Sequence, residues 1–331
     1  MKKILIVSGD PNSINSEIIY ESWKKLPKSI KKKIYIISNY NLLKKQFKIL
    51  NYKINIVKVK SIFESEKSFD LKLINIDLRF NNPFNISKKN ASQFVLKSLN
   101  MAHKLALKKN VAGIVNCAID KNLLIKEKIG VTEYLANKCN LKDDTYAMLI
   151  WNNKLSVCPI TTHINLKEVS RIITAAKIFK KIKTINDWYK HFKRKPKFCV
   201  LGLNPHNAEF RSNSEEKKII LPAVKKLNKL GINVKGPLSA DNIFIKDFIN
   251  YDVIVGMYHD QVLTPFKTLF KFDAINITVG LKYLRTSPDH GTAINMIKKK
   301  KSNALSLLKC INFINKFTKW DLQKNHLVKI F

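Results

Sequence analysis

Short apolar runs alternate with longer segments of helical periodicity along most of the chain, and this alternation constrains the fold more than any other feature. Several of the short runs are apolar at every position, which is typical of parallel strands covered on both faces. Repeated alternation of strand and helix predicts an α/β fold with a largely parallel sheet. The expected strands are Ile4–Val7, Ile34–Ile37, Ile54–Val59, Leu73–Leu78, Gly113–Cys117, Ala147–Trp151, Ser156–Ile160, Phe198–Leu203, Val253–Met257 and Ala274–Val279.

Four longer segments have the periodicity of helices, and residues with cap preferences stand near some of their ends. Asn165 and Ser214 are suitable N-terminal caps, and Gly231 suits the position just after a helix. A chain of 331 residues has room for two α/β domains. The expected helices are Ala91–Lys109, Lys167–Ile182, Glu215–Leu230 and Gly291–Phe317.

The formal net charge of +37 leaves two interpretations open. A strongly basic chain often binds nucleic acid or another polyanion. Here only five of the 61 basic residues are arginines, whose planar fork suits phosphate and base recognition better than lysine does. Lysine is spread along the whole chain with isoleucine and asparagine, which share A/T-rich codons with it. We therefore favour solvated surface charge and expect no nucleic-acid partner.

The cysteines and the apolar runs indicate a reducing compartment without a membrane span. The five cysteines are odd in number and widely spaced, with no C-x-x-C pair, so we expect small buried hydrophobic residues rather than disulfides. No apolar run approaches the roughly 20 residues of a transmembrane helix. The apolar start Ile4–Val7 is too short for a signal peptide and is read as a strand. We expect a cytoplasmic protein.

Polar motifs follow several of the expected strands, at the edge where open α/β sheets bind their ligands. Three of the seven histidines stand there: His163, His206 and His259. Imidazoles from separate loops can bind one divalent cation and leave positions open for a substrate. Each histidine taken singly could equally be a hydrogen-bonded structural residue, and their sequence spacing does not decide the question.

Other polar residues near these motifs have a functional and a structural interpretation. Asp241 and Asp260 could orient an imidazole or transfer a proton, although Asp241 could also be a helix cap. Lys267 and Arg285 could bind a phosphate or a carboxylate, although a lysine in this chain could simply be surface charge. The sequence has no G-x-G-x-x-G and no Walker-type phosphate loop.

The longer motifs resemble those of the 4-hydroxythreonine-4-phosphate dehydrogenase family. The two most specific segments are Tyr251–Lys267 and Arg285–Ala293. Thr161-Thr162-His163, Leu201–His206 and Gly236–Asp241 match in the same order, so the resemblance runs from Gly9 to about Ala293.

This resemblance implies a fold like that of isocitrate and isopropylmalate dehydrogenases, which bind NAD without the Rossmann glycines. It implies two α/β domains, one made of residues 1–125 plus 283–331 and the other of residues 126–282, with the active site in the cleft between them. It also implies a homodimer in which the subunits share each active site, with the dimer contact in the second domain.

The family's functional residues carry over by motif. The metal ligands would be His163, His206 and His259, one of them supplied by the partner subunit. The substrate would contact Thr132, Lys267, Asn276 and Arg285, and Asp241, Asp260 and Lys267 would serve catalysis. The dinucleotide would lie near Asp289, His290, Gly291 and Thr292.

The implied reaction is oxidation of the C3 hydroxyl of 4-phosphooxy-L-threonine by NAD, with NADP as the alternative, followed by loss of CO2 to give 3-amino-2-oxopropyl phosphate. This step belongs to pyridoxal 5'-phosphate biosynthesis and would use a divalent metal such as zinc, magnesium or cobalt. One alternative is a dehydrogenase for a related threonate or erythronate phosphate. Another is a basic, non-catalytic relative that binds nucleic acid.

The sequence departs from the family pattern at three places. The family's first loop usually reads Gly-Asp-Pro-Ala-Gly-Ile-Gly-Pro-Glu, whereas Asn12, Ser13, Asn15 and Ser16 replace its inner residues here. Val131 stands where the family has a histidine that contacts the substrate. Valine cannot make that charge-assisted bond, and the loss could weaken the free energy of substrate binding by roughly 1.5–3 kcal/mol. The glycines expected after Asn-Pro-His are missing from 207–210. We therefore expect a working site with weaker or altered substrate binding.

Overall fold

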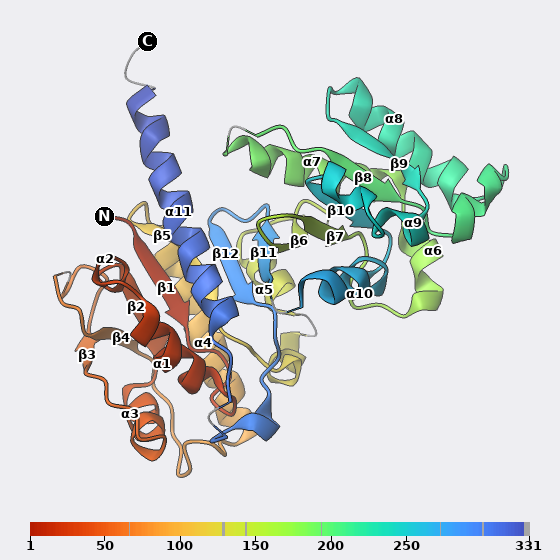
Figure 1. Ribbon diagram of the computed structural model, residues 1–331. Helices are drawn as coiled ribbons and strands as arrows, with labels where there is room; N and C mark the ends of the chain where they lie inside the picture. The colour runs from red at the N-terminus through yellow and green to blue at the C-terminus, as the bar shows by residue number, and fades with distance from the viewer. Residues whose placement is uncertain are drawn as a thin grey trace. The chain divides into compact units, whose positions relative to one another are not determined.

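The computed structural model describes residues 1–65, 67–127, 130–142, 144–192, 194–271, 273–299 and 301–327. Its contacts divide the chain into two compact units (Figure 1). Unit 1 comprises Met1–Asn140 and Leu281–Phe331, and unit 2 comprises Leu141–Gly280. Each unit is an α/β structure built on a mostly parallel sheet, as the alternating pattern predicts.

In unit 1 the described strands lie in the order β3-β4-β2-β1-β5-β12, and all neighbours are parallel. The central strand β1 is buried at all five positions, which explains why its sequence is continuously apolar. Its register pairs Ile4 with Ile34 on one side and with Gly113 on the other. The strands are β1 (Lys3–Val7), β2 (Ile34–Ser38), β3 (Ile56–Val59), β4 (Leu71–Asn75), β5 (Val111–Asn116) and β12 (Leu284–Pro288).

The helices of unit 1 flank this sheet, with α4 packed against β1, β2 and β5 and α11 packed against β5 and β12. Ser87 caps α4 and Asn39 caps α3, each accepting a backbone N–H bond in the first turn. The main helical elements are α1 (Asn15–Lys25), α2 (Lys28–Lys31), α3 (Tyr40–Ile49), α4 (Lys88–Ala106), η1 (Lys121–Glu127), α5 (Val131–Lys138), η6 (Ile294–Met296) and α11 (Leu305–Leu327).

One expectation about unit 1 needs correction. The helix expected over Gly291–Phe317 begins only at Leu305, because Ala293 has a left-handed φ of 47° and the preceding segment is bonded to the first loop. The division by contacts falls after Asn140, and the domain boundary at residue 126 stays a prediction. Helix α5 groups with unit 1, and the Tyr134 hydroxyl donates to Asn100 Oδ1 on α4 at 2.8 Å.

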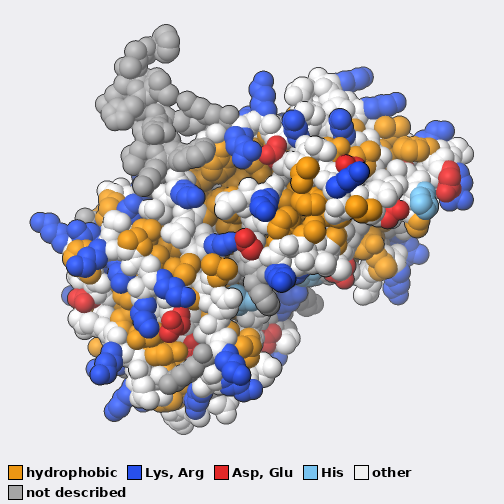
Figure 2. Space-filling model, viewed as in Figure 1, with side chains coloured by type: hydrophobic (Ala, Val, Ile, Leu, Met, Phe, Trp, Pro, Cys, Tyr) orange, Lys and Arg blue, Asp and Glu red, His pale blue; other side chains and the backbone are white. Residues whose placement is uncertain are grey.

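The lysines are mostly superficial, and the cysteines are buried. Figure 2 shows blue lysine and arginine side chains scattered over the visible face among other residue types, rather than gathered in one stripe. Lys72 in β4 is a fully buried exception, whose Nζ donates to the carbonyl of Lys32 at 2.8 Å and lies 4.9 Å from the ring centre of Tyr35. All five cysteines are free and buried, as expected. Within the described ranges, no helix is both long and apolar enough to cross a bilayer.

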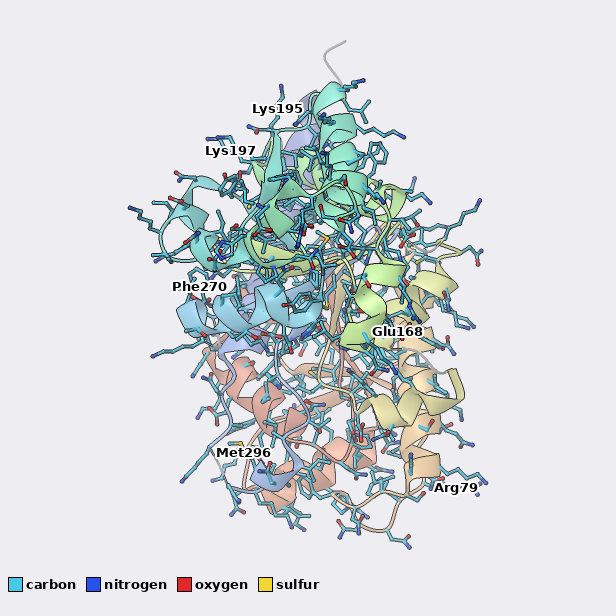
Figure 3. The ribbon with its side chains drawn as sticks, turned by 90° about the vertical axis from the view of Figure 1, so that its right-hand side faces the viewer. Arg79, Glu168, Lys195, Lys197, Phe270 and Met296 are labelled. Atoms are coloured by element: carbon cyan, nitrogen blue, oxygen red, sulfur yellow. The ribbon has the colours of Figure 1, made fainter. Side chains whose placement is uncertain are left out.

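In unit 2 the described strands lie in the order β11-β6-β7-β10-β8-β9. β6 runs antiparallel to β7 and β11, and the other neighbours are parallel. A core of apolar side chains from β6, β7, β8 and β10 packs against helix α10, which ends at Phe270 (labelled in Figure 3). The strands are β6 (Ala147–Trp151), β7 (Ser156–Pro159), β8 (Phe198–Leu201), β9 (Val234–Leu238), β10 (Val253–Gly256) and β11 (Ile275–Val279).

The helix expected over Lys167–Ile182 is interrupted. Ile173 and Thr174 are extended, and the Thr174 hydroxyl accepts from Lys177 N, so a new helix begins at Ala175. The expected helix Glu215–Leu230 is present and ends before Gly231, whose φ is 72°. The main helical elements of unit 2 are η2 (Leu166–Glu168), α6 (Val169–Ile172), α7 (Ala175–Lys190), η3 (Pro205–Phe210), η4 (Glu216–Ile220), α8 (Leu221–Lys229), α9 (Ala240–Ile243), η5 (Asp247–Asn250) and α10 (His259–Phe270).

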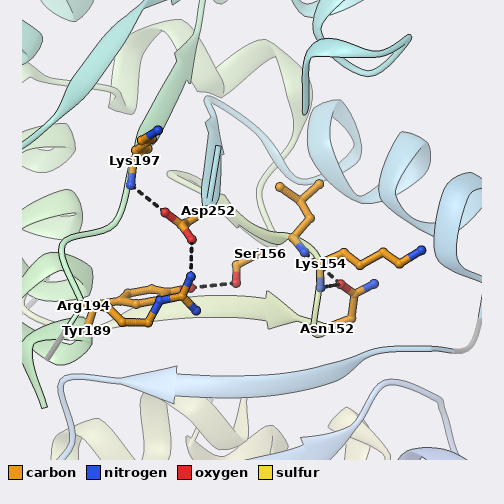
Figure 4. A network of polar contacts seen from close by, with 8 residues as sticks. Asn152, Lys154, Ser156, Tyr189, Arg194, Lys197 and Asp252 are labelled. Atoms are coloured by element: carbon orange, nitrogen blue, oxygen red, sulfur yellow. Dashed lines mark hydrogen bonds and ion pairs between the residues drawn. The ribbon is translucent and has the colours of Figure 1, made fainter. Parts of the chain in front are cut away.

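A polar network closes the N-terminal edge of this sheet (Figure 4). The Asp252 carboxylate, just before β10, accepts from Lys197 N and from the Arg194 guanidinium, both at 2.9 Å. The hydroxyls of Ser156 and Tyr189 lie 3.0 Å apart. These contacts fix the starts of β7, β8 and β10, which leaves their C-terminal ends as the edge available for ligands.

Candidate functional site

Two of the expected metal ligands come together at the C-terminal edge of unit 2. His163 follows β7 and His259 begins α10 just after β10, and these two strands are parallel neighbours with Gly256 beside Pro159. The imidazole ring centres are 5.7 Å apart, and the rings are inclined by 38°. Both line a pocket of about 550 Å³ whose other walls include Thr161, Leu166 and Val169.

Hydrogen bonds between the strand ends fix the loops that carry this pair. The Thr161 hydroxyl donates to Met257 O at 2.7 Å, which joins the end of β7 to the end of β10. Gln261 accepts from Met257 N and donates to Gly202 O, each at 2.7 Å, so it joins β10 to the end of β8. The backbone supporting the two imidazoles is therefore bonded across three neighbouring strands.

The chemistry of the histidine pair fits a divalent cation. Asp260 Oδ1 lies 2.7 Å from His259 Nδ1, and a carboxylate in that position holds the proton on Nδ1 and leaves Nε2 free to bind a metal. Two imidazoles at this separation can both be ligands of one cation. Of the two roles that the sequence leaves open for Asp260, this contact favours orientation of an imidazole over proton transfer, and the role stays a prediction.

Among the residues that the structure describes, His206 belongs to no group of three His, Cys, Asp or Glu side chains that could hold a metal ion. It lies in the exposed turn after β8. Of the three histidines expected to bind the metal, only His163 and His259 lie together within the described part of one chain.

The turn that carries His206 has an unusual backbone. Five successive residues, His206–Phe210, have φ between 47° and 55°, which is the left-handed region favoured by glycine. Each such residue that is not glycine costs roughly 1–2 kcal/mol. Without glycines in this segment, the turn is therefore strained.

Glu216 supports this turn, although no sequence motif pointed to it. Its Oε1 accepts from Leu203 N and Asn204 N, both at 2.8 Å, and the side chain is completely buried. Burial opposes ionisation, but the hydrogen bonds outweigh it and lower the pKa of Glu216. The only sequence signal was a carboxylate at the start of a helical segment, a common surface feature.

The other expected residues of unit 2 lie on separate elements. Asp241 is exposed in α9, and Lys267 is exposed in the last turn of α10. Asn276 lies in β11, and its Oδ1 is buried without a hydrogen-bond partner among the described residues. A buried amide oxygen without a partner is costly, which favours a role in binding a polar group.

In unit 1, Arg285 lies in β12 and is only 3% exposed. Its Nε donates to Asn116 Oδ1 at 2.6 Å and its Nη1 to Thr132 Oγ1 at 3.3 Å, so both of these partners are neutral oxygens. Burial lowers the pKa of Arg285 to about 10. A guanidinium presents a planar fork of N–H donors, so a buried arginine is suited to bind an anion. Val131, the first residue of α5, stands beside Thr132.

The expected dinucleotide turn, Asp289–Thr292, follows β12 directly. Asp289 N donates to the Ser306 hydroxyl at 3.1 Å, and Thr292 O accepts from Ile14 N at 3.2 Å. His290 Nδ1 lies 2.9 Å from Gly291 O, and its Nε2 is buried with no partner in the described part of the chain. The turn is thus anchored at both ends.

Comparison with known proteins identifies the family of this chain. The family model described as pyridoxal phosphate biosynthetic protein PdxA matches residues 30–314. The chain is 38% identical over 323 residues to 4-hydroxythreonine-4-phosphate dehydrogenase of Sulfurihydrogenibium sp., covering 94% of this chain and 97% of the relative. It is 31% identical to a putative D-threonate 4-phosphate dehydrogenase of Oceanobacillus iheyensis, covering 93% of this chain and 95% of the relative.

Solved structures lead to the same family. A crystal structure of 4-hydroxythreonine-4-phosphate dehydrogenase from Klebsiella pneumoniae matches with a TM-score of 0.83 at 28% identity, covering 96% of this chain and 99% of that one. A β-decarboxylating dehydrogenase from Thermococcus kodakarensis shares the fold alone, with a TM-score of 0.50 at 10% identity. The expected fold class is confirmed, and the chain belongs to the pyridoxal phosphate biosynthetic protein PdxA family.

Proposed function

We propose that this protein is an NAD-dependent, metal-dependent dehydrogenase that oxidises 4-phosphooxy-L-threonine and releases CO2 to give 3-amino-2-oxopropyl phosphate. The similarity to a relative named for this substrate extends over nearly the whole of both chains. The observation that carries the proposal is the His163–His259 pair, with Asp260 against one imidazole, at the strand edge that the family motifs indicate.

His163 and His259 would hold the divalent metal. Bound there, the metal would act as a Lewis acid toward the substrate oxygens. The chain's own contribution is orientation, because Asp260 fixes the imidazole of His259 and the Thr161 and Gln261 bonds fix the loops. Imidazole ligands suit zinc and cobalt, and the coordination positions left open to oxygen ligands could also admit magnesium.

The charged ends of the substrate would be bound by cations and amides. Arg285 would bind a phosphate or carboxylate, since burial strengthens the attraction and Asn116 and Thr132 hold the guanidinium in place. Lys267 would supply a second cation, and the buried Oδ1 of Asn276 would accept from a substrate hydroxyl or ammonium.

Proton transfer would fall to a side chain that is not occupied in orienting a ligand. Asp260 is bonded to His259, so Asp241 and Lys267 are the better candidates for exchanging protons with the hydroxyl and with the decarboxylated product. The dinucleotide, NAD or NADP, would lie against the turn Asp289–Thr292.

The proposal includes a homodimer in which the partner's copy of the 206–210 turn contributes a third imidazole. Its support is that His206 is exposed and joins no potential metal cluster in the described part of one chain. Unit 2 also carries Ile245 and Ile249 at 71% and 74% exposure, which is unusual for isoleucine and suits a protein contact.

The test is NADH formation from 4-phosphooxy-L-threonine by protein stripped of metal and then supplied with one divalent cation at a time. Metal-dependent turnover that His259→Ala abolishes and His191→Ala preserves is the expected result, because His191 lies exposed at the end of α7. Absence of turnover in folded, metal-loaded wild-type protein would refute the assigned substrate.

A second candidate substrate is a threonate or erythronate phosphate. Val131 replaces a family residue that contacts the substrate, and a relative of similar length is named for D-threonate 4-phosphate. Comparing kcat/KM across the three phosphorylated hydroxy acids separates these possibilities. Nucleic-acid binding without NADH formation would instead favour the basic non-catalytic alternative.

A further inference from the structure

The first loop, Gly9–Ser16, replaces the small residues of the family pattern with side chains that are buried rather than solvated. Ser13, Asn15 and Ser16 are 1%, 2% and 4% exposed. A buried polar side chain normally has hydrogen-bond partners. The Ser13 hydroxyl and the Asn15 amide nitrogen have them, whereas Ser16 Oγ and Asn15 Oδ1 have none among the described residues. The bonds of Asn12, Ser13 and Asn15 therefore indicate what the replacements do.

Asn12 joins the loop to a distant part of unit 1. Its Nδ2 donates to Ile86 O and its Oδ1 accepts from Ile86 N, both at 2.8 Å. The side-chain amide therefore pairs with a backbone peptide group 74 residues away in the manner of a neighbouring strand. Alanine, the usual family residue here, could make neither bond.

Ser13 makes hydrogen bonds within the loop, and Asn15 joins the loop to the segment just after β5. The Ser13 hydroxyl donates to Asp10 O at 2.6 Å and accepts from Asn15 N at 3.2 Å. The Asn15 amide donates to Ala118 O at 2.8 Å and lies 2.7 Å from the point where a Cβ on Gly9 would stand, so it packs directly over that glycine. Glycine at either position would remove these bonds.

The backbone accommodates these residues without strain. None of the residues from Asp10 to Glu17 has a positive φ. The loop thus contrasts with His206–Phe210, where side chains occupy left-handed positions. Replacing glycine with serine or asparagine here lowers the conformational entropy of the unfolded loop. It also adds hydrogen bonds to the folded loop.

The dinucleotide turn rests on this loop. Ile14 N donates to Thr292 O at 3.2 Å, and the carboxylate of Glu17, at the start of α1, accepts from Lys298 N at 2.8 Å. Met296, labelled in Figure 3, stands between these two attachment points in the sequence, beside the N-terminal helices. A fixed first loop therefore fixes the position of Asp289–Thr292.

We propose that Asn12, Ser13 and Asn15 are positioning residues that hold the dinucleotide turn in its binding conformation before the cofactor arrives. The inference rests on the proposed function in taking a nicotinamide dinucleotide as the ligand of that turn. If the turn is already ordered, cofactor binding does not have to supply the conformational free energy of ordering it. The three replacements therefore strengthen cofactor binding without contacting the cofactor.

The test restores the family residues in the triple variant Asn12→Ala/Ser13→Gly/Asn15→Gly of the full chain. Titration with NADH, followed by its fluorescence, gives Kd without any substrate. We expect Kd to rise about five- to tenfold, as when the binding-competent fraction falls to between a fifth and a tenth. KM for NAD should rise in parallel, with kcat and the substrate KM within about twofold of wild type. Amide exchange at 289–298 in the ligand-free protein should accelerate.

Two further variants separate positioning from general damage. Asn12→Ala alone, at a partly buried position, keeps the experiment informative if the triple variant folds poorly, and it should raise Kd by about two- to threefold. Asn152→Ala removes a comparable asparagine that accepts from Lys154 N and Leu155 N in unit 2, and it should leave Kd unchanged.

An unchanged NADH Kd and unchanged exchange at 289–298 in the triple variant would overturn the inference. Equal effects of Asn12→Ala and Asn152→Ala would do the same. A third outcome is that the wild type binds NADH, the triple variant binds it more weakly, and neither protein oxidises any phosphorylated hydroxy acid. In that case the positioning role stands and the proposed reaction fails. If the wild-type protein binds no dinucleotide, the turn has no such ligand and the inference is wrong.

Discussion

Replacing Glu209 with glycine should stabilise the protein. Glu209 has φ 47° and ψ 26°, a left-handed conformation that costs an L-residue roughly 1–2 kcal/mol. Its side chain is 69% exposed, and its ion pair with Arg211, at 3.8 Å between equally exposed groups, contributes little. Glycine removes the conformational cost but loses about 0.5–1 kcal/mol more backbone entropy on folding. The difference is a gain of about 0.5–1 kcal/mol, or roughly 1–4 °C in Tm for a protein of this size.

The assay is urea unfolding at 25 °C together with a thermal scan, with Glu168→Gly as the matched control. Both substitutions remove one negative charge, but Glu168 has a φ of −91° at the start of α6, where glycine should lower stability by about 0.5–1 kcal/mol. Opposite signs for the two variants would establish the strained turn. If Glu209→Gly destabilises as much as Glu168→Gly, the left-handed turn is not the conformation in solution and the reasoning is wrong.

Three further outcomes are expected. Asp260→Asn should weaken binding of the divalent cation about 10–100-fold in a chelator competition, whereas Asp247→Asn should leave it unchanged. Because the pKa of Glu216 is lowered in the folded state, its stabilisation is present above the unfolded value near 4.5 and is lost as pH falls through the lower folded pKa. Glu216→Gln should therefore cost about 1.5–3 kcal/mol at pH 7 and flatten the fall in urea stability below about pH 4.5. Arg285→Lys should raise the substrate KM at least about tenfold without changing the NADH Kd, because lysine cannot bond both existing partners and still present a planar fork.

The sequence predicted the strands that are mostly apolar in composition and missed β9 and β12, whose composition is not typical of a strand. β1 and β10 are apolar and buried at every position, so their pattern was unambiguous. β9 contains Gly236 and Pro237 at a sheet edge, where proline is tolerated but lowers any strand signal. β12 reads as polar although all five residues are buried, because its sequence is Leu-Arg-Thr-Ser-Pro. A buried strand of polar residues is hard to recognise from its sequence pattern.

The site was predictable where it depends on strand order and unpredictable where it depends on backbone contacts. His163 and His259 meet because β7 and β10 are adjacent, which follows from the rule for parallel sheets. Glu216 and Asn12 act by bonding to peptide groups 12 to 74 residues away, and no pattern in the sequence identifies such partners. The late start of α11 has the same origin, since bonds to the first loop override the helical periodicity of the segment before it.

Lys72 can serve as a chemical reporter of the opening of unit 1, because it is buried in a chain whose other lysines are mostly exposed. Its amine is enclosed by backbone carbonyls and the ring of Tyr35, while most other lysines face solvent. An acylating reagent should therefore modify the surface amines of the native protein quickly and reach Lys72 only when β4 separates from its neighbours. Mass spectrometry of the peptide containing Lys72 would then record the opening rate of unit 1, with the surface lysines in the same digest as the internal standard.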